Sequence, residues 1–326
     1  MKKEKSMHKT SVGGQALIEG IMMRGPKGAA IAVRTPDGEI DIEEREVTSI
    51  AKKYKILGIP VVRGVVNFIE SMIFGYKCLM YSAEKSGMED METSEENMSK
   101  LDKWLSEHWS EKAMNFFTGL ASVLGIVLAF GLFIWLPTFL VNIIKSHSTF
   151  DLTNYRALIE GVMRIIIFIA YMAIVSMMKD IKRVFMYHGA EHKTIFCYEH
   201  GLELTVENVK KQSRFHPRCG TSFMFVMIIL SVLISSVISI LFPHLRDVTA
   251  IWMLVKLLIL PFVMGLGYEF IKYAGRHENI VVRILSAPGL WMQRLTTKEP
   301  ADDIIEVGIA AFKAVITDNP EDDAIK

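Results

Sequence analysis

Four stretches of the chain are apolar over enough residues to cross a lipid bilayer as helices. They run from Met114 to Ile144, Ala157 to Met178, Ser222 to Phe242 and Ala250 to Ile271, and the third contains no charged residue. A helix rises about 1.5 Å per residue, so about 20 apolar residues span the hydrocarbon core. Helices of soluble cores rarely stay apolar for that long. The pattern predicts an α-helical polytopic membrane protein with about four transmembrane helices.

Charged residues nevertheless fall inside two of the predicted spans. Glu160 and Arg164 lie in the second span, and Lys256 and Glu269 lie in the fourth. Because uncompensated charge in hydrocarbon is costly, such residues are functional candidates. Structural interpretations stay open beside this one. Glu160 and Arg164 are spaced i,i+4 and could neutralise each other, and Lys256 could extend its ammonium group towards the interface.

The residues before the spans predict a small β unit over positions 11–47. Ile31–Thr35 and Ile40–Val47 have strand character and flank a turn, Pro36-Asp37-Gly38-Glu39. The segment Gly13–Gly20 lacks the lysine and hydroxyl residue of a phosphate-binding loop. We therefore interpret it as a tight turn that leads into a strand.

An apolar helix with one narrow polar stripe is predicted over residues 56–82. The stripe consists of Arg63, Asn67, Glu70 and Lys77. Such a helix lies in the membrane interface, packs against the spanning helices or is buried in the soluble unit, and all three alternatives stay open. Residues 84–100 are acidic and polar, which predicts a linker. Residues 101–112 carry Trp104 and Trp109, which are typical of a membrane surface.

The C-terminal segment predicts a helix that packs on the β unit. Thr296-x-x-Glu299 has the spacing of a capping box and precedes Pro300. Apolar residues then recur at helical spacing at Ile304, Ile305, Ile309, Phe312 and Ile316. This stripe predicts a packing face, so the N-terminal β unit and the C-terminal helix together would form a small cytoplasmic α+β portion.

These elements divide the chain into seven segments. In order, we expect a cytoplasmic N-terminal β unit (1–55), an amphipathic or membrane-associated helix (56–83), an acidic linker with an interfacial helix (84–113), transmembrane helices 1 and 2 (114–178), a cytoplasmic histidine-rich loop (179–221), transmembrane helices 3 and 4 (222–271) and a cytoplasmic C-terminal cap (272–326). The 179–221 connection carries eight Lys and Arg residues, whereas the other two connections carry Lys145 with Arg156, and Arg246. The basic side of a membrane protein stays in the cytoplasm, so both termini and the 179–221 loop are predicted to be cytoplasmic.

Composition and charge agree with a membrane protein whose main partner is the lipid bilayer. Hydrophobic residues make up 51% of the 326 residues, and 37 basic residues nearly balance 36 acidic ones. A net charge of +1 argues against a nucleic-acid partner. The three cysteines, Cys78, Cys197 and Cys219, are odd in number and widely spaced, which favours a reducing compartment over a disulfide framework. No apolar core follows the basic start, so no secretory signal is expected.

One motif in the chain suggests a reaction. In His188-x-x-Glu191-His192 the two histidines are spaced i,i+4, so on a helix both imidazoles share a face and could bind one divalent ion. Glu191 is then close enough to act as a general base towards a water molecule at that ion. This is the inverted zinc-peptidase spacing. The alternative is a purely structural role, in which these residues form hydrogen-bonded i,i+3 and i,i+4 pairs on a cytoplasmic helix.

Topology places further candidate ligands on the same side of the bilayer. His216 and Cys219 precede the third span, and Glu269 lies at the cytoplasmic end of the fourth. Zinc takes three or four nitrogen, sulfur or carboxylate ligands, so the two histidines with Glu269 or Cys219 would suit it. If the second span continued straight, ten residues at about 1.5 Å would place His188 roughly 15 Å below the membrane edge. Reaching Glu269 would then need a bend, for which Gly189 is the candidate.

Cys219 has two other interpretations. It follows His216-Pro217-Arg218, where a turn cysteine without chemistry is common, and no second cysteine lies at two-residue spacing. A nucleophilic pair of Cys219 with His216 is the other alternative.

Several motifs resemble the YqhQ-type membrane protein family (domain of unknown function 1385). They are the segment from Gly13 to Pro26, the run from Tyr187 to Thr194, the run from His216 to Ser222, and the tail from Pro288 to Pro300. The resemblance covers nearly the whole chain except the acidic linker. It implies a bacterial integral membrane family described as metal-dependent enzymes without a settled activity.

Two functional hypotheses of different classes follow. The first is a metal-dependent hydrolase at the cytoplasmic membrane face, with His188 and His192 as ligands, Glu269 or Cys219 completing the set, and Glu191 as the general base. The second is a non-enzymatic membrane component, such as a transporter subunit or an assembly factor, in which the histidine motif is structural. It rests on Glu160, Arg164 and Lys256 inside the spans and on the charged stripe of Arg63, Glu70 and Lys77. Four spans are few for a solute path, so a transporter would require a homo-oligomer.

Overall fold

The computed structural model describes residues 8–47, 49–50, 54–87, 111–147, 155–277, 279–319 and 321–325. The predicted interfacial residues Trp104 and Trp109 and most of the acidic linker lie outside these ranges. The chain forms two compact units. We call residues 1–87, 172–227 and 264–326 the sheet unit, and residues 88–171 and 228–263 the helical unit.

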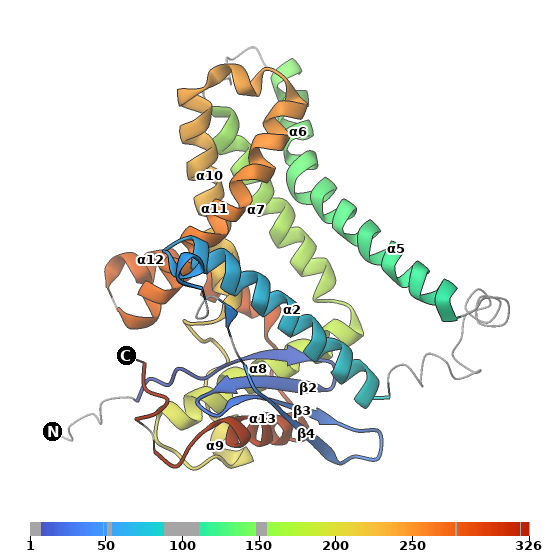
Figure 1. Ribbon diagram of the computed structural model, residues 1–326, viewed down its shortest axis with the longest axis vertical. Helices are drawn as coiled ribbons and strands as arrows, with labels where there is room; N and C mark the ends of the chain where they lie inside the picture. Colours follow the sequence, from blue (N-terminus) through green and yellow to red (C-terminus); the bar gives the residue numbers. More distant parts are fainter. Residues whose placement is uncertain are drawn as a thin grey trace. The chain divides into compact units, whose positions relative to one another are not determined.

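A four-stranded antiparallel sheet lies in the sheet unit, with strands paired in chain order (Figure 1). The strands are β1 (Gly13–Leu17), β2 (Gly20–Gly25), β3 (Gly28–Arg34) and β4 (Ile40–Arg45). The β unit is thus confirmed, and the predicted turn at residues 36–39 joins β3 to β4. The segment Gly13–Gly20 differs from its interpretation as a turn, because it pairs as a strand with β2.

Helices cover both faces of this sheet. α8 (Lys179–Glu199) and α13 (Asp302–Val315) pack on one face, where Ile21 and Met23 contribute to the core. α2 (Val62–Lys85) packs on the other face, where Leu17 and Ile31 contribute. Neighbouring residues of one strand therefore enter different cores. The predicted packing of the C-terminal helix against the β unit is confirmed.

Three further helices lie in the sheet unit. They are the 3-10 helix η1 (Lys55–Gly58), α9 (Val206–Lys210) and α12 (Ile280–Thr296). The predicted capping box is wrong. Thr296 is the last residue of α12, and α13 begins after Ala301, which makes no side-chain cap. Asp302 and Asp303 instead place negative charge in the first turn of α13, where the helix dipole favours it.

Four helices of the described residues are long and apolar enough to span a membrane. These candidate spans are Gly119–His147, Arg156–Val175, Met224–Leu241 and Thr249–Arg276. The first combines α5 (Glu111–Phe130), the π-helical turn η2 (Gly131–Trp135) and α6 (Leu136–His147); the others belong to α7 (Arg156–Val175), α10 (Gly220–Leu241) and α11 (Thr249–Arg276). The short 3-10 helix η4 (Pro243–Arg246) follows α10.

Charges within the helical unit form a buried cluster whose pairing differs from the predicted one. Glu160 accepts hydrogen bonds from Arg156 one turn earlier, from Lys256 and from Trp252, and does not pair with Arg164. Lys256 is buried and also donates to Thr138 at 2.7 Å, so it does not extend to an interface. The carboxylate is thereby shared by two cations, which compensates the charges in place.

Arg164 has a separate role beside the proline of the first span. Pro137 has no N–H, so the carbonyl of Phe133, four residues earlier, lacks its helical donor. Arg164 Nε donates to that carbonyl at 3.0 Å, and its Nη1 donates to Ser231 at 2.8 Å. In an apolar surrounding every backbone polar group needs such a partner.

The second span does not continue straight into the histidine motif. α7 ends at Val175, and α8 begins at Lys179 after Met178, whose backbone is extended (ψ 136°). The chain therefore turns before α8, and Gly189, the candidate for a bend, lies inside the continuous helix α8. Gly189 is needed for another reason. A Cβ atom there would lie 2.1 Å from the carbonyl oxygen of Lys298, which crosses the helix at this point.

Candidate metal centre

The histidine motif lies on a helix that is enclosed along its second half. α8 is polar in sequence, yet Glu191, His192, Lys193 and Glu199 are all buried. Lys193 shows how such burial is satisfied, because its ammonium donates to the carbonyls of Lys210 and Gln212 at 2.9 and 2.8 Å. A buried polar helix of this kind is costly unless each group has a partner. The partners are therefore informative about the site.

His188 and His192 each have one ring nitrogen bonded to a backbone carbonyl. Nδ1 of His188 lies 2.8 Å from the carbonyl oxygen of Thr296, and Nδ1 of His192 lies 2.6 Å from that of Arg214. A carbonyl only accepts, so both Nδ1 atoms must carry the proton. In the neutral imidazole the lone pair is then on Nε2. Metal-binding histidines are usually oriented by an outer hydrogen bond of this type.

Cys219 completes a group of three potential ligands. His188, His192 and Cys219 each offer one ligand atom, and these atoms lie within 4.8 Å of one another. Cys219 Sγ is 3.2 Å from Nε2 of His188. Within the described part of the chain, this group does not include Glu191, His216 or Glu269.

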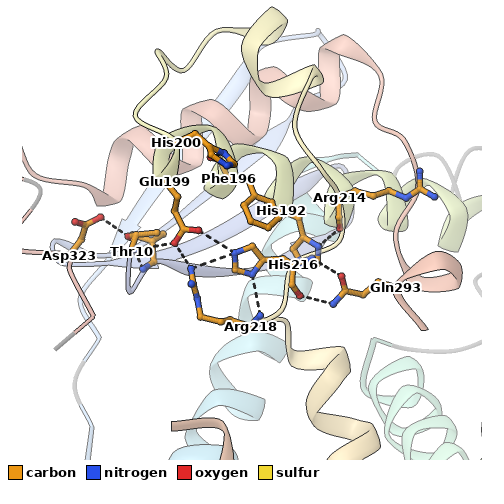
Figure 2. Close-up of polar contacts among 11 residues, drawn as sticks. Thr10, His192, Phe196, Glu199, His200, Arg214, His216, Arg218, Gln293 and Asp323 are labelled. Atoms are coloured by element: carbon orange, nitrogen blue, oxygen red, sulfur yellow. Dashed lines mark hydrogen bonds and ion pairs between the residues drawn. The ribbon is translucent and has the colours of Figure 1, made fainter. Parts of the chain in front are cut away.

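The loop that carries Cys219 is fixed by one side chain of α12. The Gln293 amide accepts from the backbone N–H of His216 at 2.7 Å and donates to the backbone carbonyl of His216 at 2.8 Å. This two-point contact is buried and sets the position of the residues that follow (Figure 2). The group thus joins α8, the loop before α10, and α12.

Glu191 is directed towards β1. Its carboxylate accepts from the backbone N–H of Gly14 at 3.1 Å, and a Cβ atom at position 14 would lie 3.1 Å from the Glu191 carboxyl carbon. Glycine at this position allows the strand to approach. Burial raises the pKa of Glu191, while the neighbouring His188 and the Gly14 N–H act in the opposite direction. A buried carboxyl with a raised pKa is a candidate for proton transfer.

His216 belongs to a second polar cluster next to the group of three, drawn in Figure 2. Its Nε2 lies 3.7 Å from Glu199, which also forms an ion pair with Arg218 and accepts from Thr10 N–H at 2.9 Å. Burial lowers the pKa of His216 to about 4, against the effect of Glu199. Burial alone would raise the pKa of Glu199, but His216 and Arg218 hold it below its ordinary value. The imidazole of His216 is therefore neutral near pH 7.

Glu269 lies apart from these residues, where α2 crosses α11. Its carboxylate forms a bidentate pair with Arg63, at 2.6 and 2.5 Å, and Asn67 donates to Tyr268 at 2.9 Å. The polar stripe predicted on residues 56–82 thus contacts the end of α11. Glu70 accepts from Ser49 at 2.8 Å.

Some residues of the site were not singled out from the sequence. These buried polar residues are Thr10, Glu199, Gln293 and Lys193. Thr10 bonds to Glu199 and Gln293 bonds to His216, and the partners in each pair are 77 or more positions apart in the sequence. Lys193 bonds to backbone carbonyls. Glu199 follows the motif by two helical turns, and this spacing was the one available signal.

The donor set fits a divalent ion. Two imidazole nitrogens and one thiol sulfur are ligands that zinc accepts, and three protein ligands leave a fourth position open. The two carbonyl-bound Nδ1 atoms supply the outer contacts that such a centre needs.

Fold and site together define a mostly helical protein with four candidate membrane spans and a two-histidine, one-cysteine group in its sheet unit. Residues 59–318 match the family model described as "Protein of unknown function (DUF1385)". The chain is also 34% identical over 321 residues to "Uncharacterized protein YqhQ" of Bacillus subtilis (strain 168), covering 95% of this chain and 94% of the relative. The chain belongs to the DUF1385 family, which confirms the resemblance. No solved structure gives a significant match.

Proposed function

We propose that this protein is a metal-dependent hydrolase of the cytoplasmic membrane face. His188, His192 and Cys219 would hold a divalent ion, and their chemistry favours zinc. The observation that carries the proposal is the hydrogen bonding of both Nδ1 atoms to backbone carbonyls, which leaves the two Nε2 lone pairs for the ion beside Cys219 Sγ. A bound divalent ion supplies Lewis-acid activation of water and of the bond to be cleaved.

Glu191 is the acid–base group in this proposal. Its carboxyl is buried, is oriented by the Gly14 N–H, and has a pKa raised by burial. Such a group takes the proton from the attacking water and returns it to the leaving group. Gly14 is then a positioning residue, because its N–H fixes one oxygen of the carboxylate.

The membrane-face location is supported by two helices of the sheet unit. α2 exposes the apolar residues Ile69, Met72, Ile73, Tyr76 and Met80 along one face, while its opposite face is buried on the sheet. α12 exposes Ile280, Ile284 and Trp291, which also share one face. Apolar stripes with an aromatic residue are typical of helices at a lipid interface. The eight Lys and Arg residues of the 179–221 connection support a cytoplasmic orientation.

The test is the metal content of full-length protein purified in detergent, measured by mass spectrometry. We expect about one zinc ion per chain in the wild type and a loss in His188→Ala and Cys219→Ala. Glu269→Gln, the matched control, should keep its metal because Glu269 pairs with Arg63. No bound divalent ion, or equal contents in all four proteins, would overturn the proposal. If Glu191→Gln retains both metal and cellular function, the centre is structural.

A second candidate function is a non-enzymatic membrane component. The observation that favours it is the buried cluster of Glu160, Arg156 and Lys256 in the helical unit. Charged groups inside membrane spans often belong to substrate or proton pathways. If this candidate holds, Glu191→Gln should be silent in cells, and Lys256→Met should abolish function at an unchanged protein level. A transporter of this kind would require a homo-oligomer.

A further inference from the structure

An apolar cavity reaches one member of the candidate metal group. It has a volume of about 670 Å³ and lies between the end of α11, the loop before α10, and α12, all within the sheet unit. Cys219 is one of its lining residues. The volume is typical of cavities that enclose a small organic ligand. An apolar cavity of this size beside a candidate metal ligand suggests an occupant.

The walls and the charges of the cavity define the chemistry of that occupant. Phe270, Ile271 and Leu290 are among its apolar lining residues. Its charged lining residues within the described chain are Lys9, Arg218 and Arg283, with no Asp or Glu among them. Arg218 already pairs with Glu199, so Arg283 is the cation that the test addresses. An apolar wall with cationic groups is complementary to a hydrocarbon chain with an anionic head.

The position of α12 gives such a molecule a route from the bilayer. α12 lines the cavity with Val282, Ser286 and Leu290, while Ile284 and Trp291 are exposed at 62% and 51%. A helix with this apolar outer face lies in the lipid interface. Lipid at that interface is therefore next to the helix that forms one wall of the cavity.

We infer that this cavity binds the acyl chain of an anionic phospholipid, with the headgroup at its cationic residues. Binding needs only the cavity. That the bound lipid is the substrate of the metal centre rests on the proposed function, and Cys219, which belongs to both, is the link between them.

Gly275 offers a way to fill the cavity without disturbing the chain. It lines the cavity, and a Cβ atom built there meets no other atom within 4 Å. Gly275→Phe therefore places a ring in open space. Gly125→Phe is the matched control, because Gly125 also lies in an apolar helix and its Cβ also meets nothing. Arg283→Glu tests the charge, with Arg294→Glu on the same helix as its control.

The experiment uses full-length protein in nanodiscs and phosphatidylglycerol with a diazirine in its acyl chain. We expect saturable crosslinks to peptides of residues 270–290, reduced at least fivefold in Gly275→Phe and unchanged in Gly125→Phe. Phosphatidylcholine with the same chain should label less, and this preference should disappear in Arg283→Glu but not in Arg294→Glu. Free glycerol phosphate should not compete, since it lacks the chain. Gel filtration of each variant reports folding.

Two results would overturn the inference: equal labelling of wild type and a folded Gly275→Phe, or equal labelling by both lipids. His188→Ala separates the two proposals. It should lose metal and keep the crosslink. If wild type binds metal but gives no crosslink in residues 270–290, the lipid inference fails and the proposed function stands. If the crosslink forms but no metal binds, the proposed function fails and the lipid site stands.

Discussion

At the residue scale, the carbonyl oxygens of Thr296 and Arg214 fix the tautomers of His188 and His192. The Nε2 atom of His188 then lies 3.2 Å from Cys219 Sγ, and the lone pair of neutral His192 is also on Nε2. A purely structural cluster could hold the same atoms, with an S–H to N hydrogen bond in place of an ion. The two possibilities differ in whether a divalent ion changes the reactivity of the Cys219 thiol.

Thiol labelling makes this difference measurable. None of the three cysteines is in a disulfide. Burial raises the pKa of Cys78 to about 11 and also raises the pKa of Cys197, so both are poor nucleophiles at pH 7. We expect a maleimide to label about one thiol per native, metal-free chain, at Cys219, and zinc to suppress it. Unfolded protein, as the control, should label all three. Faster labelling of Cys78, or no protection by zinc, would contradict the assignment.

As the pH falls, protonation of His216 should lower the free energy of unfolding before Glu199 is protonated. The pKa of His216 is about 4 in the folded chain and about 6.5 when unfolded, so the unfolded state binds more protons between these values. Stability therefore falls as the pH drops from about 6.5 to about 4, by on the order of 2 to 3 kcal/mol. Below that, the lowered pKa of Glu199 extends the loss.

Thermal unfolding in detergent across this pH range checks the effect. His216→Gln should flatten the curve between pH 6.5 and 4. His200→Gln is the matched control, since His200 is an exposed histidine at the C-cap of α8, next to Glu199. An identical curve for His216→Gln and wild type would show that His216 does not carry the dependence.

At the element scale, the ends and interruptions of helices determine where the histidine motif and the buried charged side chains lie. The break at residues 176–178 separates α7 from α8. Pro137, which lacks an N–H, leaves the carbonyl of Phe133 to accept from Arg164. The four apolar helices could be predicted because a run of about 20 apolar residues rarely occurs in any structure other than a membrane-spanning helix. The pairing of Glu160 with Lys256 could not, because the two are 96 positions apart. The i,i+4 rule pointed to Arg164 and missed the equally spaced Arg156.

Removing the carboxylate of that cluster should be severe. Glu160→Gln leaves Lys256 and Arg156 buried without a counter-charge, which costs about 3 to 5 kcal/mol. We expect a large drop in the unfolding temperature of the helical unit in detergent. The double variant Glu160→Gln/Lys256→Met should recover part of the loss, because one uncompensated cation is removed. A single variant as stable as the wild type would show that the buried pair is not needed.

At the scale of the whole molecule, the sequence predicts the spans, the β unit and its contact with the C-terminal helix. It does not predict α12, because Pro288 and Gly289 inside that helix resemble a break. It names His188, His192 and Cys219 but ranks Glu269 beside them, since topology alone puts all four at one side of a bilayer. The contact between α2 and α11 separates Glu269 from the candidate metal ligands, because it supplies Arg63 as the partner of Glu269.

X-ray absorption of the zinc-loaded, full-length protein measures the ligand set directly. Three ligands from His188, His192 and Cys219 predict one sulfur at about 2.3 Å and two imidazole nitrogens at about 2.0 to 2.1 Å from the ion. Cys219→Ser should remove the sulfur and leave the nitrogens. A wild-type spectrum with no sulfur, or with two carboxylate oxygens in place of the imidazoles, would contradict the assignment.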